Sequence, residues 1–193
     1  IKKIIRSKHK KKINKNPKIL FYTQADKIKD KKIGKIGNLI DEVKKQNIAE
    51  IYILSYEPME KNSYLNLLKQ PNMIYEYITK EILIKTRIAA NELNNKWRAI
   101  SEHNKSDLLK IEEKSLYPYI KQELDFLFSK EFLKLIFLYH EAHKELLKQE
   151  NIRLVCSIGA GSFYHKTLFS AAINQKVKTL VSQHCMCIIY TEL

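Results

Sequence analysis

Apolar residues fall into short runs of β-forming residues near both ends of the chain. KILFYT, residues 18–23, predicts a first strand, and IAEIYILSY, residues 48–56, predicts a second. The segment between them ends at Asn47 and has apolar residues at helical spacing, namely Ile33, Ile36, Ile40 and Val43. A strand, a helix and a strand in succession form a β-α-β unit, so we expect the two strands to be parallel.

The middle of the chain has a different pattern, with no clear strand from Tyr75 to Gln149 and a poor candidate for one at residues 73–78. Residues 81–100 predict a long amphipathic helix around Ile84, Ile88, Leu93 and Trp97. Pro118 interrupts the pattern. Residues 120–150 resume it with a broad apolar face made of Leu124, Leu127, Phe128, Phe132, Leu135, Ile136 and Leu138. We therefore expect residues 75–150 to form a helical insertion packed on an α/β core.

The α/β pattern then returns. Residues 152–161 predict a strand that ends in a glycine pair, and residues 177–184 predict another. Ser162 is expected to cap the helix between them, with Leu168, Ala171 and Ala172 facing inward. Two such units predict a Rossmann-like, doubly wound parallel sheet, whose ligands lie beyond the carboxyl ends of the strands. The residues expected there are Thr23, Tyr56, Gly159–Ser162, Gln183 and His184.

Charge is distributed unevenly. The net charge is +14, and residues 1–18 hold nine Lys/Arg and no acid, so the other 175 residues carry +5. We expect a basic arm, residues 1–17, before a domain of residues 18–193. Such an arm can bind nucleic acid or an anionic membrane face, and a solvated linker is the alternative.

The bulk features favour a cytoplasmic protein. No run of 18 apolar residues exists, and no apolar segment follows the basic start to make a signal peptide. The three cysteines, Cys156, Cys185 and Cys187, are too few for a disulfide framework in a chain of 193 residues.

GAGS, residues 159–162, joins a predicted strand to a predicted helix. Glycine lets the backbone approach a ligand, and the N–H groups that begin a helix attract phosphate or carboxylate. Tyr164 stands where a dinucleotide-binding fingerprint needs its third glycine, so that fingerprint is absent. A tight turn without a ligand is the alternative. Asp26 and Asp30 follow the first strand as candidate general bases or as solvated loop residues.

Histidine and cysteine clusters give no metal site. His184, Cys185 and Cys187 have a spacing too tight for a zinc ion, and buried thiols are favoured over a catalytic cysteine. His140 and His143 are three residues apart, and Lys144 occupies the position where a zincin has its second histidine. We expect these two histidines to lie on a polar helix face.

Residues 152–190 resemble the end of the N-terminal domain of GT-B-type glycosyltransferases of surface polysaccharide synthesis. The wider group includes CDP-glycerol glycerophosphotransferase-like and UDP-N-acetylglucosamine 2-epimerase-like proteins. The matching positions are Leu168, Ala171, Ala172, Thr179, Gln183, His184 and Tyr190. Cys185 departs from the glycine that follows the histidine in this family, and cysteine adopts a positive φ less readily than glycine does.

The resemblance implies a domain that holds a glycan or lipid-linked acceptor, with a nucleotide-sugar or CDP-glycerol-type donor on a second domain and no cofactor in this chain. His184 would be the general base on the acceptor hydroxyl or a donor to a phosphate. The substrate-binding residues would be Thr23, Asp26, Gly159, Gly161, Ser162 and Gln183.

A second Rossmann-like half does not fit after residue 193, so we expect the chain to be a fragment. The basic arm would hold the enzyme near the inner membrane face. One alternative is a non-catalytic α/β module that binds an anionic ligand or a protein partner. Another is nucleic-acid binding through residues 1–18.

Overall fold

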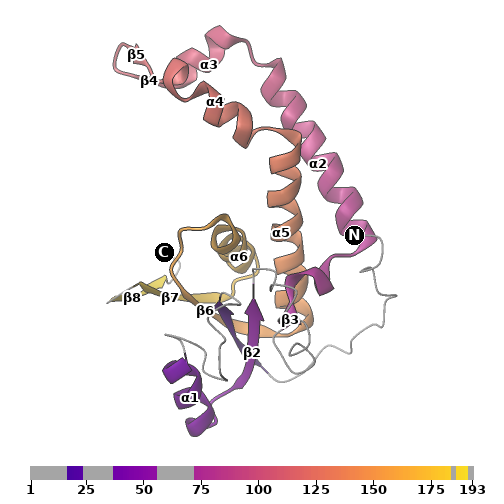
Figure 1. Ribbon diagram of the computed structural model, residues 1–193, viewed down its shortest axis with the longest axis vertical. Helices are drawn as coiled ribbons and strands as arrows, with labels where there is room; N and C mark the ends of the chain where they lie inside the picture. Colours follow the sequence, from indigo (N-terminus) through magenta and orange to yellow (C-terminus); the bar gives the residue numbers. More distant parts are fainter. Residues whose placement is uncertain (1–16, 24–36, 56–71, 184–185, 191–193) are drawn as a thin grey trace, which may run out of the picture. The chain divides into compact units, whose positions relative to one another are not determined.

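The structure is a computed structural model that describes residues 17–23, 37–55, 72–183 and 186–190 (Figure 1). Its main sheet has the strand order β3-β2-β1-β6-β7-β8. These strands are β1 (Lys18–Thr23), β2 (Glu50–Ser55), β3 (Asn72–Met73), β6 (Ile152–Ile158), β7 (Lys178–Gln183) and β8 (Met186–Tyr190). Neighbouring strands are parallel except for β7 and β8, which are antiparallel. The predicted Rossmann-like α/β fold is therefore confirmed.

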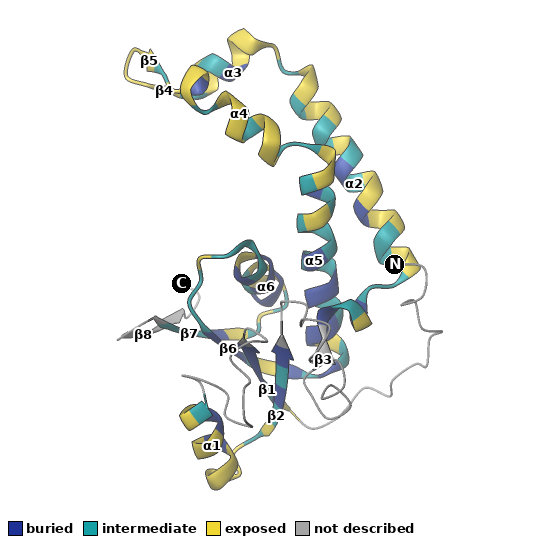
Figure 2. Cartoon of the chain, in the orientation of Figure 1, coloured by how far each residue is buried: buried dark blue, intermediate teal, exposed yellow. Residues whose placement is uncertain are grey.

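Helices cover both faces of this sheet. On one face, α1 (Gly37–Gln46) packs Ile40 and Val43 in a cluster with Phe21 and Cys156. On the other face lie α6 (Phe163–Asn174) and the end of α5 (Lys130–Gln149). The main buried residues of that second cluster are Leu20, Tyr22, Leu54, Ala142, Leu146, Leu147, Val155, Leu168, Ala171 and Ala172 (Figure 2). The inward positions predicted for α6 are thus confirmed.

Left-handed residues follow the helices of this α/β part. Asn47 has φ 50° after α1, Asn151 has φ 51° after α5, and Lys176 has φ 56° after α6. Asparagine tolerates this conformation better than most residues, which is why it often ends a helix. The Asn47 N–H donates to the Lys44 carbonyl at 3.1 Å, so the predicted end of the first helix is confirmed.

A buried ion pair lies at the amino end of β1. Lys18 Nζ donates to Glu150 Oε2 at 2.7 Å, and Tyr77 Oη donates to Glu150 Oε1 at 2.9 Å. Tyr77 also shares a hydrogen bond with Tyr52, and burial raises the pKa of both phenols. The network joins β1, β2, the 3₁₀ helix η4 (Ile74–Tyr77) and the end of α5. These hydrogen bonds lie away from the carboxyl end of β1 and tie the start of this strand to the end of α5.

The chain forms two compact units. One contains Ile1–Ile78 and Tyr139–Leu193, and the other is the helical unit Thr79–Leu138. The helical unit comprises α2 (Lys80–Ala99), α3 (Glu102–Leu108), α4 (Tyr117–Leu127), the first part of α5, and a hairpin of β4 (Lys110–Ile111) and β5 (Lys114–Ser115). Helix α5 continues from this unit into the α/β unit.

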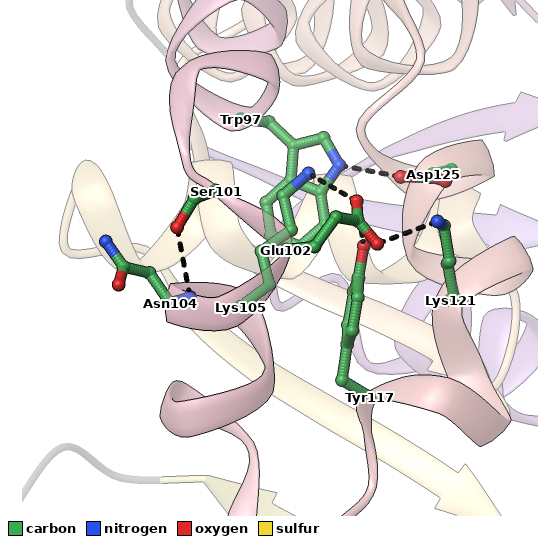
Figure 3. A network of polar contacts seen from close by, with 8 residues as sticks. All are labelled: Trp97, Ser101, Glu102, Asn104, Lys105, Tyr117, Lys121 and Asp125. Carbon is green, nitrogen blue, oxygen red and sulfur yellow. Dashed lines mark hydrogen bonds and ion pairs between the residues drawn. The ribbon is translucent and has the colours of Figure 1, made fainter.

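A polar network holds α2, α3 and α4 together within the helical unit (Figure 3). Trp97 Nε1 donates to Asp125 at 3.0 Å, and Lys121 Nζ donates to Glu102 at 2.7 Å. Tyr117 Oη also donates to Glu102, at 3.0 Å. The hydrogen bonds from Lys121 and then Tyr117 lower the pKa of the Glu102 carboxyl. The short helix α3 is therefore tied to α4 by charge-assisted hydrogen bonds.

Three element predictions in the middle of the chain are wrong. Residues 73–78 form mostly the helix η4, and the β4–β5 hairpin lies in a region predicted to have no strand. Residues 120–150 form two helices rather than one, because α4 ends at Leu127 and α5 begins at Lys130. Apolar residues continue across this break, so the hydrophobic pattern does not mark it. Pro118 lies in the first turn of α4, where its missing N–H costs no hydrogen bond.

The packing face predicted for α2 is wrong in its first half, at Ile84 and Ile88, whereas Leu93 and Trp97 are half-buried as predicted. The buried residues of this helix are Thr86 and Ala90. Ile84 and Ile88 are instead 62% and 52% exposed. The second strand likewise begins at Glu50, which leaves Ile48 exposed before it.

Candidate functional site

The site is built on the turn between β6 and α6, at the carboxyl edge of the sheet. Gly159 has φ +79°, a conformation that glycine adopts without strain. Its N–H donates to the Ser182 carbonyl of β7 at 3.0 Å, and Ser157 Oγ donates to the Gly159 carbonyl at 3.4 Å. The start of the turn is therefore fixed to the neighbouring strand.

The turn is open at both of its glycines. A Cβ atom built on Gly159 or Gly161 has no atom of the described residues within 4 Å. The positive φ accounts for the glycine at position 159. Neither a positive φ nor a close neighbour among the described residues accounts for Gly161. The described residues therefore leave space beside Gly161 for a ligand that approaches the backbone.

Ser162 caps helix α6, as the sequence predicts. Its Oγ accepts the His165 N–H at 3.5 Å and lies 2.6 Å from His165 Nδ1. Burial lowers the pKa of His165 to about 4, so the imidazole is neutral near pH 7. The first N–H groups of α6 form the positive end of the helix dipole, and they adjoin the turn. The neutral His165 lies beside them.

A buried polar chain lies behind this turn. The Thr167 hydroxyl donates to the Tyr164 carbonyl at 3.0 Å, so it accepts from His143 Nδ1 at 3.4 Å. With Nδ1 protonated in a neutral ring, His143 Nε2 accepts from Tyr22 Oη at 3.1 Å. Burial lowers the pKa of His143 to about 3, which keeps the ring neutral. The Tyr22 ring lies edge-on to both His143 and His165, with centroids 5.5 Å apart in each pair.

The prediction that His143 lies on a polar helix face is therefore wrong. His143 is fully buried between β1 and α6. A signal was present in the sequence, because His143 falls within an inward stripe at helical spacing. The other members of that stripe are Tyr139, Ala142 and Leu146. His140, three residues earlier, is half-buried and is bonded to Asn174 of α6 at 3.2 Å.

The backbone brings five of the predicted site residues to one edge of the sheet. Thr23 ends β1 and Gln183 ends β7, and both strands pair with β6, whose carboxyl end leads to Gly159. Gly161 and Ser162 continue from that point into α6. Asp26, Asp30, Tyr56, His184 and Cys185 lie outside the described residues. The predicted grouping at the sheet edge therefore rests on Thr23, Gln183 and residues 159–162.

A second candidate cluster lies in the helical unit. A polar concavity of about 600 Å³ is lined by Trp97, Glu102, Lys105, Lys121, Asp125 and neighbouring residues. The Trp97 ring stacks on Phe128 with centroids 4.3 Å apart, and Lys105 Nζ lies 4.5 Å from its centroid. These contacts engage Trp97 and Lys105 with their neighbours in the helical unit, so the cluster stabilises the packing of the helices.

The described residues contain neither a metal-binding cluster nor a helix that could cross a membrane. No group of three or more His, Cys, Asp or Glu side chains among them could hold a metal ion. None of their helices is both long enough and apolar enough to cross a membrane. The Cys156 thiol is buried in the cluster beneath α1.

Comparison of the chain with protein-family models, curated proteins and solved structures finds no significant match in any of the three.

Proposed function

We propose that the chain is the acceptor-side domain of a GT-B-like glycosyl- or glycerophosphotransferase of cell-surface polysaccharide synthesis. In this proposal a nucleotide-activated donor binds a second domain, and a glycan or lipid-linked acceptor binds the carboxyl edge of the sheet described above. The basic residues of segment 1–18 would contact an anionic membrane face.

The observation that carries the proposal is the open turn from Gly159 to Ser162. Ligands of open parallel sheets bind beyond the carboxyl ends of the strands, where this turn lies. The N–H groups at the start of α6 favour an anionic group such as the phosphate of an acceptor. The space beside Gly161 allows that group to reach the backbone. The buried Tyr22, His143 and Thr167 join β1, α5 and α6 by hydrogen bonds.

Gly161→Leu tests whether a ligand occupies this space. The added side chain meets none of the described residues near its Cβ, so we expect the fold to be retained. We expect the variant to bind glycerol 3-phosphate at least about tenfold more weakly, because the phosphate loses hydrogen bonds to the backbone. Amide signals of residues 161–165, followed by NMR during titration with glycerol 3-phosphate, report the binding.

Ser170→Leu is the matched control, because it adds the same side chain at an exposed position of α6 away from the turn. It should bind as the wild type does. The proposal for the turn fails if glycerol 3-phosphate shifts no amide signal there, or if Gly161→Leu binds it unchanged.

A non-catalytic module would bind its anionic ligand at the same turn. Binding of glycerol 3-phosphate therefore does not distinguish such a module from a transferase domain. Transfer from a nucleotide-activated donor does separate them, because a binding module leaves the donor intact.

A further inference from the structure

Histidines are distributed unequally between the two faces of the main sheet. His140 and His143 lie on the end of α5 and His165 lies on α6, in the layer that covers one face. The other histidine that the structure describes, His103, is exposed in the helical unit. The cluster beneath α1, on the opposite face, therefore contains no described histidine; its buried residues are Phe21, Ile40, Val43 and Cys156.

His143 is surrounded by groups that disfavour a cation. It is fully buried, and its ring nitrogens are bonded to the hydroxyls of Tyr22 on β1 and Thr167 on α6. Burial lowers its pKa most, followed by charge on His140 and then on His165. No carboxylate of the described residues forms an ion pair with His143. An imidazolium ion at this position would thus be buried without a counter-ion.

His165 lies close by among similar neighbours. The Tyr22 ring lies edge-on to both imidazoles, with centroids 5.5 Å apart in each pair, and the Tyr139 ring centroid lies 6.1 Å from that of His143. Ser162 Oγ lies 2.6 Å from His165 Nδ1. Phenols and hydroxyls carry no negative charge at acid pH, so these neighbours do not neutralise an imidazolium ion.

We propose that the layer of α5 and α6 is an acid-sensitive switch, which separates from the sheet at low pH while the layer of α1 stays packed. In the open state water reaches His143 and His165, so each proton that they take up favours that state. Positive charges on α5 and α6 then repel each other. The switch does not depend on the function proposed for the turn, although opening also releases the turn where α6 begins.

The switch operates between pH 6.5 and about 4.5. An exposed histidine takes up a proton near pH 6.5, whereas burial holds the pKa of His143 at about 3 and that of His165 at about 4. The closed layer is thus fully stabilised above pH 6.5 and loses stability as the pH falls. The ratio of open to closed molecules should rise by about 10³- to 10⁴-fold between pH 7 and about pH 4.5. Ordinary carboxyl groups take up protons mostly below this window.

Acid titration of the full chain, followed by NMR and fluorescence, tests the switch. The amide signals of Leu168 and Ala171 report α6, those of Ile40 and Val43 report α1, and Trp97 emission reports the helical unit. We expect the α6 signals to leave their native positions reversibly by about pH 4.5, while the other two probes stay unchanged. Simultaneous loss of all three shows global unfolding and overturns the proposal. Native α6 signals at that pH overturn it as well.

Substitution of either buried histidine tests whether these residues drive the transition. In the wild type the steepness of the transition should correspond to uptake of about two protons. His143→Gln and His165→Gln should each reduce this number to about one, because one titrating group is removed. His103→Gln is the control and should leave the steepness unchanged. An unchanged steepness in both buried-histidine variants would assign the transition to other groups and overturn the proposal.

Discussion

Two histidines are buried in a neutral state close to the open turn. His143 lies between the Tyr22 and Thr167 hydroxyls, and His165 lies beside the capping Ser162. Burial lowers both pKa values, to about 3 and about 4, from an ordinary value near 6.5. Neither imidazole is therefore a cation near neutral pH, and both act by hydrogen bonding and packing.

The stability of the protein should fall as the pH drops below 6.5. The unfolded chain binds protons at both histidines from about pH 6.5 downward, while the folded chain does so only near pH 3 to 4. The contribution of the two neutral histidines to the free energy of unfolding is therefore fully present above pH 6.5. It decreases toward acid pH, by about 2 kcal/mol for His143 at pH 5. Urea unfolding at several pH values between 7 and 5 measures this slope.

His143→Gln should unfold more easily at pH 7 and show a flatter pH slope, since the titrating group is gone. His103→Gln is the control: His103 is exposed and paired only at the surface with Asp107. An identical slope for the wild type and His143→Gln would contradict the assignment of a buried neutral His143.

His184 is the predicted general base of the proposed transferase. His184→Ala should lower turnover by about 10²- to 10⁴-fold in the presence of the donor-binding domain, because a positioned general base contributes that much. The assay follows transfer from CDP-glycerol or a nucleotide sugar. His103→Ala, in the helical unit, should leave turnover unchanged. Turnover of His184→Ala within a few-fold of the wild type would remove the catalytic role.

At the scale of elements, the sequence predicts β1, β2, β6, β7 and α6 of the α/β part, but not the antiparallel strand β8. β1 occupies residues 18–23 as predicted, and Ser162 begins α6 as its cap. These elements are predicted correctly because each one combines a regular spacing of hydrophobic residues with a local signal at its end, such as Asn47 or Ser162.

The helical elements were harder to predict, because hydrophobicity does not show which neighbour a face will meet. Ile84 and Ile88 have the spacing of a core face, yet α2 buries Thr86 and Ala90. The candidate site was predicted in part. The glycines after a strand predict the turn at residues 159–162. The sequence does not predict the burial of His143, because histidine is a polar residue and favours a surface position. Its burial depends on partners that are remote in the chain, Tyr22 on β1 and Thr167 on α6.

At the scale of the whole molecule, the two compact units differ in their cores. Among the described residues, the buried apolar side chains of the helical unit are Ala90, Tyr117 and Leu133. The two extended clusters of buried residues both belong to the α/β unit. Because burial of apolar surface is the main stabilising term, we expect the helical unit to be the less stable of the two.

The helical unit should therefore unfold at a lower urea concentration than the α/β unit. Trp97 is the single tryptophan of the chain and lies in the helical unit, so its fluorescence reports that unit alone. We expect its transition to precede the main transition in far-UV circular dichroism, which reports both units. Coincident transitions would show one cooperative unit instead.

The central place of β1 in the sheet has a consequence for synthesis of the chain on the ribosome. β1 pairs with β2 on one side, close by in the sequence, and with β6 on the other. β6 emerges roughly 100 residues after β2, which takes roughly 5–20 s at usual translation rates. During that delay the nascent chain exposes one unpaired edge of β1, whose Leu20, Phe21 and Tyr22 are fully buried in the folded protein. The helical unit is translated within the same interval, so it can fold before the sheet that precedes it is complete.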